Sequence, residues 1–155
     1  MMSSNHSEIS AELSLGLVGP EHMIVPLTAS LSYRDTDPYA VRMAFHVGTD
    51  EPVEWTFARD LLTAALHSRE GIGDVQAWPS AAPGDPTAGG AQVGATTGHS
   101  ILNIAMSSPF GRAQFEMSAE AIHRFLQRTY EMVPAGQEPG YLDFDAELTE
   151  LLSQA

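Results

Sequence analysis

The sequence predicts an α+β domain built from two β-rich halves, each of which ends in a helix. Two observations lead to this fold class. Segments with an apolar residue at every second position recur along the chain, which is typical of half-buried strands. Two of these runs pass into segments with helical spacing of apolar residues, at 57–66 and 118–133, and a further helical segment follows at 143–152. The expected order is ββββ-α-βββ-α followed by a short C-terminal helix.

The first half contains the four strands that alternation places at 9–17, 25–33, 39–47 and 53–58. The connections between them are short and contain Gly, Pro or Asp, so an antiparallel meander is expected. After the last strand, the spacing of apolar residues changes from two to three or four. The strand therefore leads into the helix at 57–66 with almost no loop.

The second half begins with an expected strand at 74–78 and continues with strands at 100–107 and 112–117, the last two joined by a hairpin. The long helix then has a clear start, because Ser118 can cap it. Its apolar stripe predicts packing against the sheet, and Pro134 and Gly136 end it.

We expect one domain over residues 9–155, preceded by a flexible N-terminus at 1–8. The stretch 80–99 is made mostly of Ala, Gly, Pro, Thr and Ser, so it is expected to be a mobile hairpin insertion. A partner-docking loop is the alternative, although it lacks Trp, Tyr and Arg anchors. The acidic helix at 143–152 is expected to dock on its own domain or on a neighbouring subunit, with partner binding as the alternative.

Composition restricts the function classes. The 155 residues carry a net charge of −13, with seven arginines, no lysine and no cysteine. The absence of lysine excludes a Walker A phosphate loop and a Schiff base, and the absence of cysteine excludes thiol nucleophiles and thiolate metal sites. No signal peptide is apparent, and no apolar run reaches the about 20 residues that span a bilayer. A cytoplasmic protein without cofactor or disulfide is expected.

No constellation of catalytic or metal-ligating residues stands out. None of the histidines pairs with another at a spacing that would place two imidazoles on one element; they are His6, His22, His46, His67, His99 and His123. Two acidic pairs, Asp35/Asp37 and Glu51/Glu54, are the nearest candidates for carboxylate catalysis. Both flank turns, where such acids usually cap and solubilise, so we predict no catalytic, cofactor-binding or metal-binding residues and no enzyme activity.

A few other side chains could bind a partner. Arg124 and Arg128 lie one helical turn apart and could hold a carboxylate or phosphate, but pairing of Glu120 with Arg124 on a solvated face is the simpler expectation. For Trp55 and Trp78, a place in the core or at a subunit interface is expected. The Arg59-Asp60 pair at the strand–helix junction is expected to start the helix and to pair locally. The partner-binding residues themselves stay unknown from the sequence.

Several motifs at compatible spacing resemble one known family, the SsgA-like proteins of filamentous actinobacteria, over roughly residues 12–152. The motifs are DPYAV at 37–41, FHVG at 45–48, VEWTFARDLL at 53–62, GDVQAWP at 73–79, SSP at 107–109, GRA at 111–113, FLQRT at 125–129, VPAG at 133–136 and DFDAEL at 143–148. The insertion at 80–99 is longer than the family pattern.

The resemblance implies a non-enzymatic adaptor in cell division and sporulation that helps to position the septum. The SsgB-type member of the family recruits the tubulin-like GTPase FtsZ, so FtsZ and other SsgA-like proteins are the implied partners. The resemblance further implies a fold like that of the whirly-type single-strand nucleic-acid-binding proteins, a homotrimer, and a location in the cytoplasm at the division septum.

The whirly likeness leaves single-stranded nucleic-acid binding as the alternative function. Such binding needs a basic groove with exposed aromatic residues. Seven arginines against twenty acidic residues leave little positive surface, and the arginines of the first 112 residues are dispersed along the chain. Charge therefore argues against nucleic acid as a partner.

Overall fold

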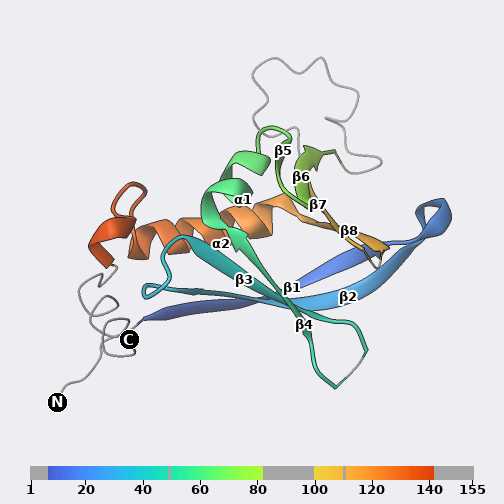
Figure 1. The fold of residues 1–155 in the computed structure, drawn as a ribbon, viewed down its shortest axis with the longest axis horizontal. Helices are drawn as coiled ribbons and strands as arrows, with labels where there is room; N and C mark the ends of the chain where they lie inside the picture. Colours follow the sequence, from blue (N-terminus) through green and yellow to red (C-terminus); the bar gives the residue numbers. More distant parts are fainter. Residues whose placement is uncertain (1–6, 49, 82–99, 110, 142–155) are drawn as a thin grey trace.

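The protein folds into one antiparallel sheet of eight strands with two α-helices packed against it (Figure 1). The computed structural model describes residues 7–48, 50–81, 100–109 and 111–141. The strand order is β4-β3-β2-β1-β8-β7-β6-β5. Each half of the chain therefore forms a four-stranded meander, and the two meanders join where β1 pairs with β8.

Each meander is followed by its helix, as the sequence predicts. The first half consists of β1 (Glu8–Val18), the 3₁₀ turn η1 (Pro20–His22), β2 (Ile24–Arg34), β3 (Ala40–His46), β4 (Val53–Ala58) and α1 (Arg59–Ala65). The second half consists of β5 (Glu70–Ile72), β6 (Val75–Ser80), β7 (Ile101–Ser108), β8 (Gly111–Ser118), α2 (Ala119–Met132) and the 3₁₀ turn η2 (Glu138–Tyr141).

The alternation that predicts the strands appears as alternating burial. In β3, Val41, Met43 and Phe45 are fully buried, whereas the residues between them are partly exposed. The curl of the sheet brings the two halves into contact. Phe45 of β3 stacks on Phe115 of β8, with ring centroids 4.4 Å apart. The apolar face of α2 joins the same core through Ile122 and its neighbours. One continuous core thus serves both halves.

The start of α2 follows the predicted capping. The Ser118 hydroxyl accepts a hydrogen bond from the Ala121 backbone N–H at 3.1 Å, which satisfies a donor that the first helical turn leaves unpaired. The helix ends at Met132, and Gly136 adopts a positive φ of 86° in the turn that follows. Glycine adopts this conformation without the steric penalty that other residues carry.

The hairpin of β1 and β2 projects beyond the rest of the sheet (Figure 1). The two strands pair from Glu8↔Arg34 to Val18↔Ile24, but β1 pairs with β8 only over 15–17. At the projecting tip, Ile24 packs directly over Gly16, where a Cβ would overlap the Ile24 side chain. We call the exposed apolar residues Met23, Ile24 and Val25 the hairpin tip.

The fold differs from the sequence prediction in one respect, and three predicted segments fall largely outside the part of the chain that the structure describes. The second meander has four strands rather than three, because β5 is only three residues long and too short to show alternation. The expected C-terminal helix at 143–152 lies outside the described residues. The same holds for the expected insertion at 80–99 except residues 80 and 81, and for the expected N-terminus at 1–8 except residues 7 and 8. Ser80 ends β6, and Glu8 begins β1.

Candidate functional site

The carboxylate pairs that sequence inspection raised do not form a site. Asp37 lies in the turn between β2 and β3, where it pairs with Arg42 at 3.8 Å. Asp35 accepts a hydrogen bond from the Ser7 backbone N–H. Glu51 and Glu54 are exposed near the start of β4. Their environments fit turn-shaping and surface roles rather than proton transfer.

The described histidines do not gather either. His22, His46, His67 and His123 are all exposed, and His46 contacts the Ser30 hydroxyl at 3.1 Å on the polar side of β3. Among the described residues, no group of three or more His, Asp or Glu side chains could hold a metal ion. Neither α1 nor α2, nor any other described helix, is long and apolar enough to cross a membrane.

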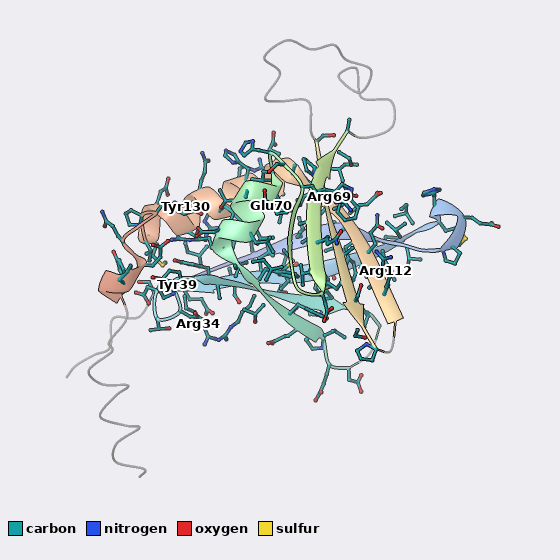
Figure 2. All side chains as sticks on the ribbon, turned by 45° about the horizontal axis from the view of Figure 1, so that its top comes forward. Arg34, Tyr39, Arg69, Glu70, Arg112 and Tyr130 are labelled. Carbon is teal, nitrogen blue, oxygen red and sulfur yellow. The ribbon has the colours of Figure 1, made fainter. Side chains whose placement is uncertain are left out.

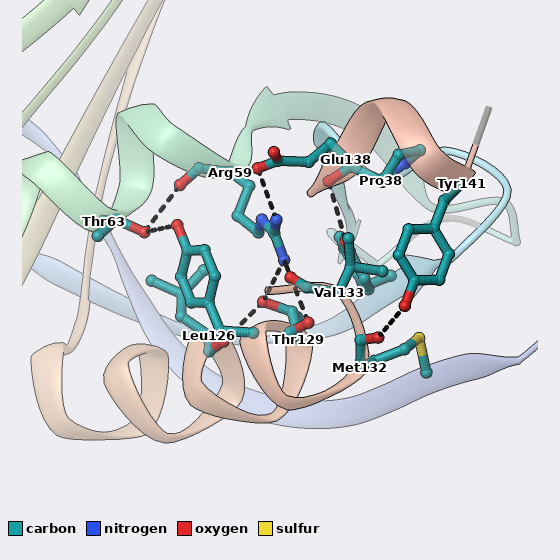
Figure 3. A network of polar contacts seen from close by, with 11 residues as sticks. Pro38, Arg59, Thr63, Leu126, Thr129, Met132, Val133, Glu138 and Tyr141 are labelled. Atoms are coloured by element: carbon teal, nitrogen blue, oxygen red, sulfur yellow. Dashed lines mark hydrogen bonds and ion pairs between the residues drawn. The ribbon is translucent and has the colours of Figure 1, made fainter. Parts of the chain in front are cut away.

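The main buried polar feature is a cluster around Arg59, the first residue of α1 (Figure 3). Its side chain is 1% exposed. Nη1 donates to the carbonyl oxygens of Thr129 at 3.1 Å and Val133 at 2.9 Å, and Nη2 donates to Glu138 Oε2 at 2.8 Å. Arg59 thereby provides partners for carbonyl groups at the end of α2, where a positive charge is favourable. We call these four residues the Arg59 cluster.

Aromatic rings complete the surroundings of this guanidinium group. Arg59 Cζ lies 4.0 Å from the Tyr130 ring centroid and 5.1 Å from that of Tyr33, both within cation–π range. The Tyr130 hydroxyl contacts the Thr63 hydroxyl at 2.7 Å, which adds a second link between α1 and α2. Burial raises the pKa of Tyr33 to about 12, and the nearby Arg59 partly opposes that increase. These contacts make the cluster a structural joint.

The ionisation of Glu138 is consistent with a structural role. Hydrogen bonds from its own backbone N–H and from Arg59 hold the pKa of its carboxyl below the ordinary value. The side chain is therefore an ion-pair partner at neutral pH rather than a proton donor. The expected local pairing of Arg59 with Asp60 is wrong: Asp60 is exposed, and Arg59 turns inward to an acid 79 positions away.

A cavity opens at the other end of β4, where the two meanders face each other. It has a volume of about 330 Å³, and we call it the mouth. Its lining residues are Leu17, Phe45, Val47, Val53, Trp55, Met106, Ser107, Ser108, Gly111, Arg112, Ala113 and Phe115. The lining is mainly apolar, and Arg112 is its single charged side chain.

The rim of the mouth is accessible to solvent. Val47 and Val53 are 39% and 45% exposed, and Trp55 is half-buried beside Phe57, with ring centroids 6.5 Å apart. Trp55 therefore packs at the edge of the core, whereas Trp78 is half-buried on the surface of β6 under Arg69 at 4.4 Å. Exposed apolar groups around a concavity are typical of binding surfaces.

The basic residues do not form a continuous groove. Figure 2 places Arg34 well away from Arg69 and Arg112, and the last two come from different elements, since Arg69 precedes β5 and Arg112 lies in β8. Arg34 pairs with Glu8 at 2.9 Å, and Arg124 pairs with Glu120 at 3.5 Å as predicted. Within the described part of the chain, this distribution lacks the basic track that single-stranded nucleic acid needs.

The comparisons with known proteins agree with this fold. Residues 27–138 match the model of the family described as Streptomyces sporulation and cell division protein, SsgA. The sporulation-specific cell division protein SsgB of Thermobifida fusca is 49% identical over 152 residues, which is 98% of this chain and 100% of that protein. SsgB of Streptomyces coelicolor is 41% identical over 97% of this chain and 99% of that protein.

Two solved structures are similar along nearly their whole length. An SsgB structure from a study that correlates SsgB mutations with longitudinal cell division during sporulation of Streptomyces coelicolor has a TM-score of 0.77 at 41% identity, covering 90% of this chain and 99% of that one. A crystal structure of an SsgA-like sporulation-specific cell division protein from Thermobifida fusca has a TM-score of 0.76 at 49% identity, covering 96% and 98%.

Replacing Arg59 tests the structural joint. Arg59→Met should lower the free energy of unfolding by about 3 to 5 kcal/mol, because it leaves Glu138 and two helix carbonyls without their buried partner. Urea denaturation followed by circular dichroism measures the loss. Adding Glu138→Gln should recover part of it, and Arg124→Met, which removes the exposed pair with Glu120, should change little. Equal losses in both arginine variants would contradict a special role for Arg59.

The same pair predicts a pH dependence. The pKa of Glu138 is lower in the folded than in the unfolded protein, so its contribution to stability is complete above the unfolded pKa and disappears as the pH falls through the folded pKa. The difference in stability between the protein and Glu138→Gln should therefore shrink as the pH falls from neutral through the ordinary glutamate pKa of 4.5 and below it. Denaturation curves across this range measure it, with the exposed Glu120→Gln as control. A pH-independent difference would show that ionisation of Glu138 is not involved.

Proposed function

The chain belongs to the SsgA family of sporulation and cell division proteins, and from this premise we propose that it is a non-enzymatic adaptor that helps to position the septum by recruiting FtsZ. The observation that carries the proposal is the match itself, which extends over both meanders and α2. The recruitment of FtsZ follows from the resemblance to SsgB-type members. We place its action in the cytoplasm at the division septum.

The surface chemistry supports an adaptor. Large apolar side chains remain exposed at separate places, including the hairpin tip and the rim of the mouth. Such groups are the usual contact points for other proteins. The net charge of −13 disfavours polyanions such as nucleic acid and leaves protein surfaces as the more suitable partners.

We further propose that the protein acts as a homotrimer, as the family resemblance implies. The hairpin tip supports self-association, because Met23 is 62% exposed on a hairpin that projects from the sheet. Contact with a second copy would remove this apolar surface from water, which is energetically favourable.

Recruitment of FtsZ is tested by co-sedimentation with GTP-assembled FtsZ at physiological salt, with a labelled single-stranded oligonucleotide in the same tube. Several-fold more protein should pellet with polymers than with unassembled FtsZ, and the oligonucleotide should remain in the supernatant. If the protein stays in the supernatant and binds the oligonucleotide in a salt-sensitive manner, the adaptor proposal fails and single-stranded nucleic-acid binding takes its place.

The trimer is tested by sedimentation velocity. The expected mass is three times that of the 16.6 kDa chain. Ile24→Glu at the hairpin tip should reduce that mass, because it would bury a charge in the contact. Ile72→Glu, at a still more exposed apolar residue that ends β5, is the matched control and should leave the mass unchanged. A monomeric parent chain would contradict the proposal.

A further inference from the structure

The mouth adjoins a free edge of the sheet. β4 is the last strand of the sheet on its side, and no strand in the described part of the chain pairs with its outer edge. Val53 and Trp55 belong both to this edge strand and to the lining of the mouth. An edge strand presents backbone N–H and C=O groups that can pair with an added strand. The same short segment thus offers a backbone template and an apolar cavity.

The chemistry of the mouth specifies what could fill it. Its volume of about 330 Å³ is sufficient for large apolar side chains, and its walls are aliphatic and aromatic. Arg112 is exposed, and within the described residues it forms no ion pair, in contrast to Arg34, Arg42, Arg59 and Arg124. A guanidinium group in this position favours a carboxylate, which it can bind through two hydrogen bonds.

We infer that the mouth and the outer edge of β4 together bind an extended segment of a partner protein, which carries alternating apolar residues and one carboxylate. The segment adds to β4 as a further strand, so that backbone hydrogen bonds hold it and alternate side chains enter the mouth. Arg112 selects the carboxylate. This inference deepens the proposed adaptor function and rests on it for the expectation of a protein partner.

A second copy of the chain fits this surface less well. Its hairpin tip is apolar and has Glu21 nearby, but it is a closed turn in which Glu21 and His22 hold positive φ angles of 58° and 60°. The part of β2 beyond its pairing with β3 contains Pro26, which has no backbone N–H to donate. The free edge of β2 next to the hairpin tip is short, and Pro26 interrupts its backbone donors, so it is a poor partner for strand addition.

The test begins with a random dodecapeptide library displayed on phage, panned against the full chain. The variants Arg112→Glu and Arg128→Glu are panned in parallel. Arg128 is the matched control because it is an exposed arginine on α2, away from the lining of the mouth. The full chain and Arg128→Glu should enrich peptides with alternating apolar residues and an Asp or Glu. Arg112→Glu should lose that acidic preference or exchange it for Lys or Arg.

An enriched peptide is then synthesised and titrated in the Trp78→Phe background, where Trp55 is the sole tryptophan and reports binding at the mouth. Arg112→Glu should weaken binding at least tenfold, and a peptide with Lys in place of its acid should restore it. Methylation of a single backbone nitrogen of the peptide should abolish binding at every second position and have little effect at the positions between them. This pattern is expected because only alternate residues of an added strand direct their N–H groups to β4.

Several results would overturn the inference. These are the absence of any enriched motif, a motif that Arg112→Glu leaves unchanged, and an Arg112→Glu variant whose sedimentation mass falls, which would make the mouth a contact between copies. Co-sedimentation with FtsZ is measured separately. If the parent chain does not pellet with FtsZ polymers, the proposed function is wrong. If the parent chain pellets with FtsZ but binds no peptide, only this inference is wrong.

Discussion

The structure depends on one buried guanidinium group. Arg59 stands where the first meander becomes helical, and its hydrogen bonds reach the last turn of α2 and the turn η2 that follows. A buried charge needs compensating partners, and here two carbonyls, a carboxylate and two aromatic rings surround the two Nη atoms and the faces of the guanidinium group, while Nε has no hydrogen-bond partner among the described residues. Because these partners come from both halves, the side chain fixes the position of α1 relative to α2.

This joint explains why the opposite end of the sheet can remain open. The Arg59 cluster and the Phe45–Phe115 stack hold the two meanders together, so the first residues of β4 need not be covered for the fold to form. Figure 2 shows the separation, with Tyr130 and Arg112 on opposite sides of the molecule. An adaptor benefits from such a division, because a rigid end supports a binding surface that the described part of its chain leaves unfilled.

Local patterns in the sequence predicted most elements, whereas the site depends on distant contacts. Alternation in β3 and the Ser118 cap depend only on residues close together in the sequence, so both could be predicted from it. The pairing of Arg59 with Glu138 was missed because the acid lies 79 positions away and nothing in local spacing marks it. The mouth was missed for the same reason, since only the curl of the sheet brings Trp55 near Arg112.

The charge distribution allows an acidic protein to choose an acidic ligand. At physiological salt the field of exposed charges decays over about 8 Å, so the net charge of −13 repels large polyanions as they approach but has little effect inside a cavity. Contact with Arg112 then acts only on a segment that has already docked. Long-range repulsion disfavours nucleic acid, while under the inference above a single local arginine selects one carboxylate on a partner whose apolar residues fit the mouth.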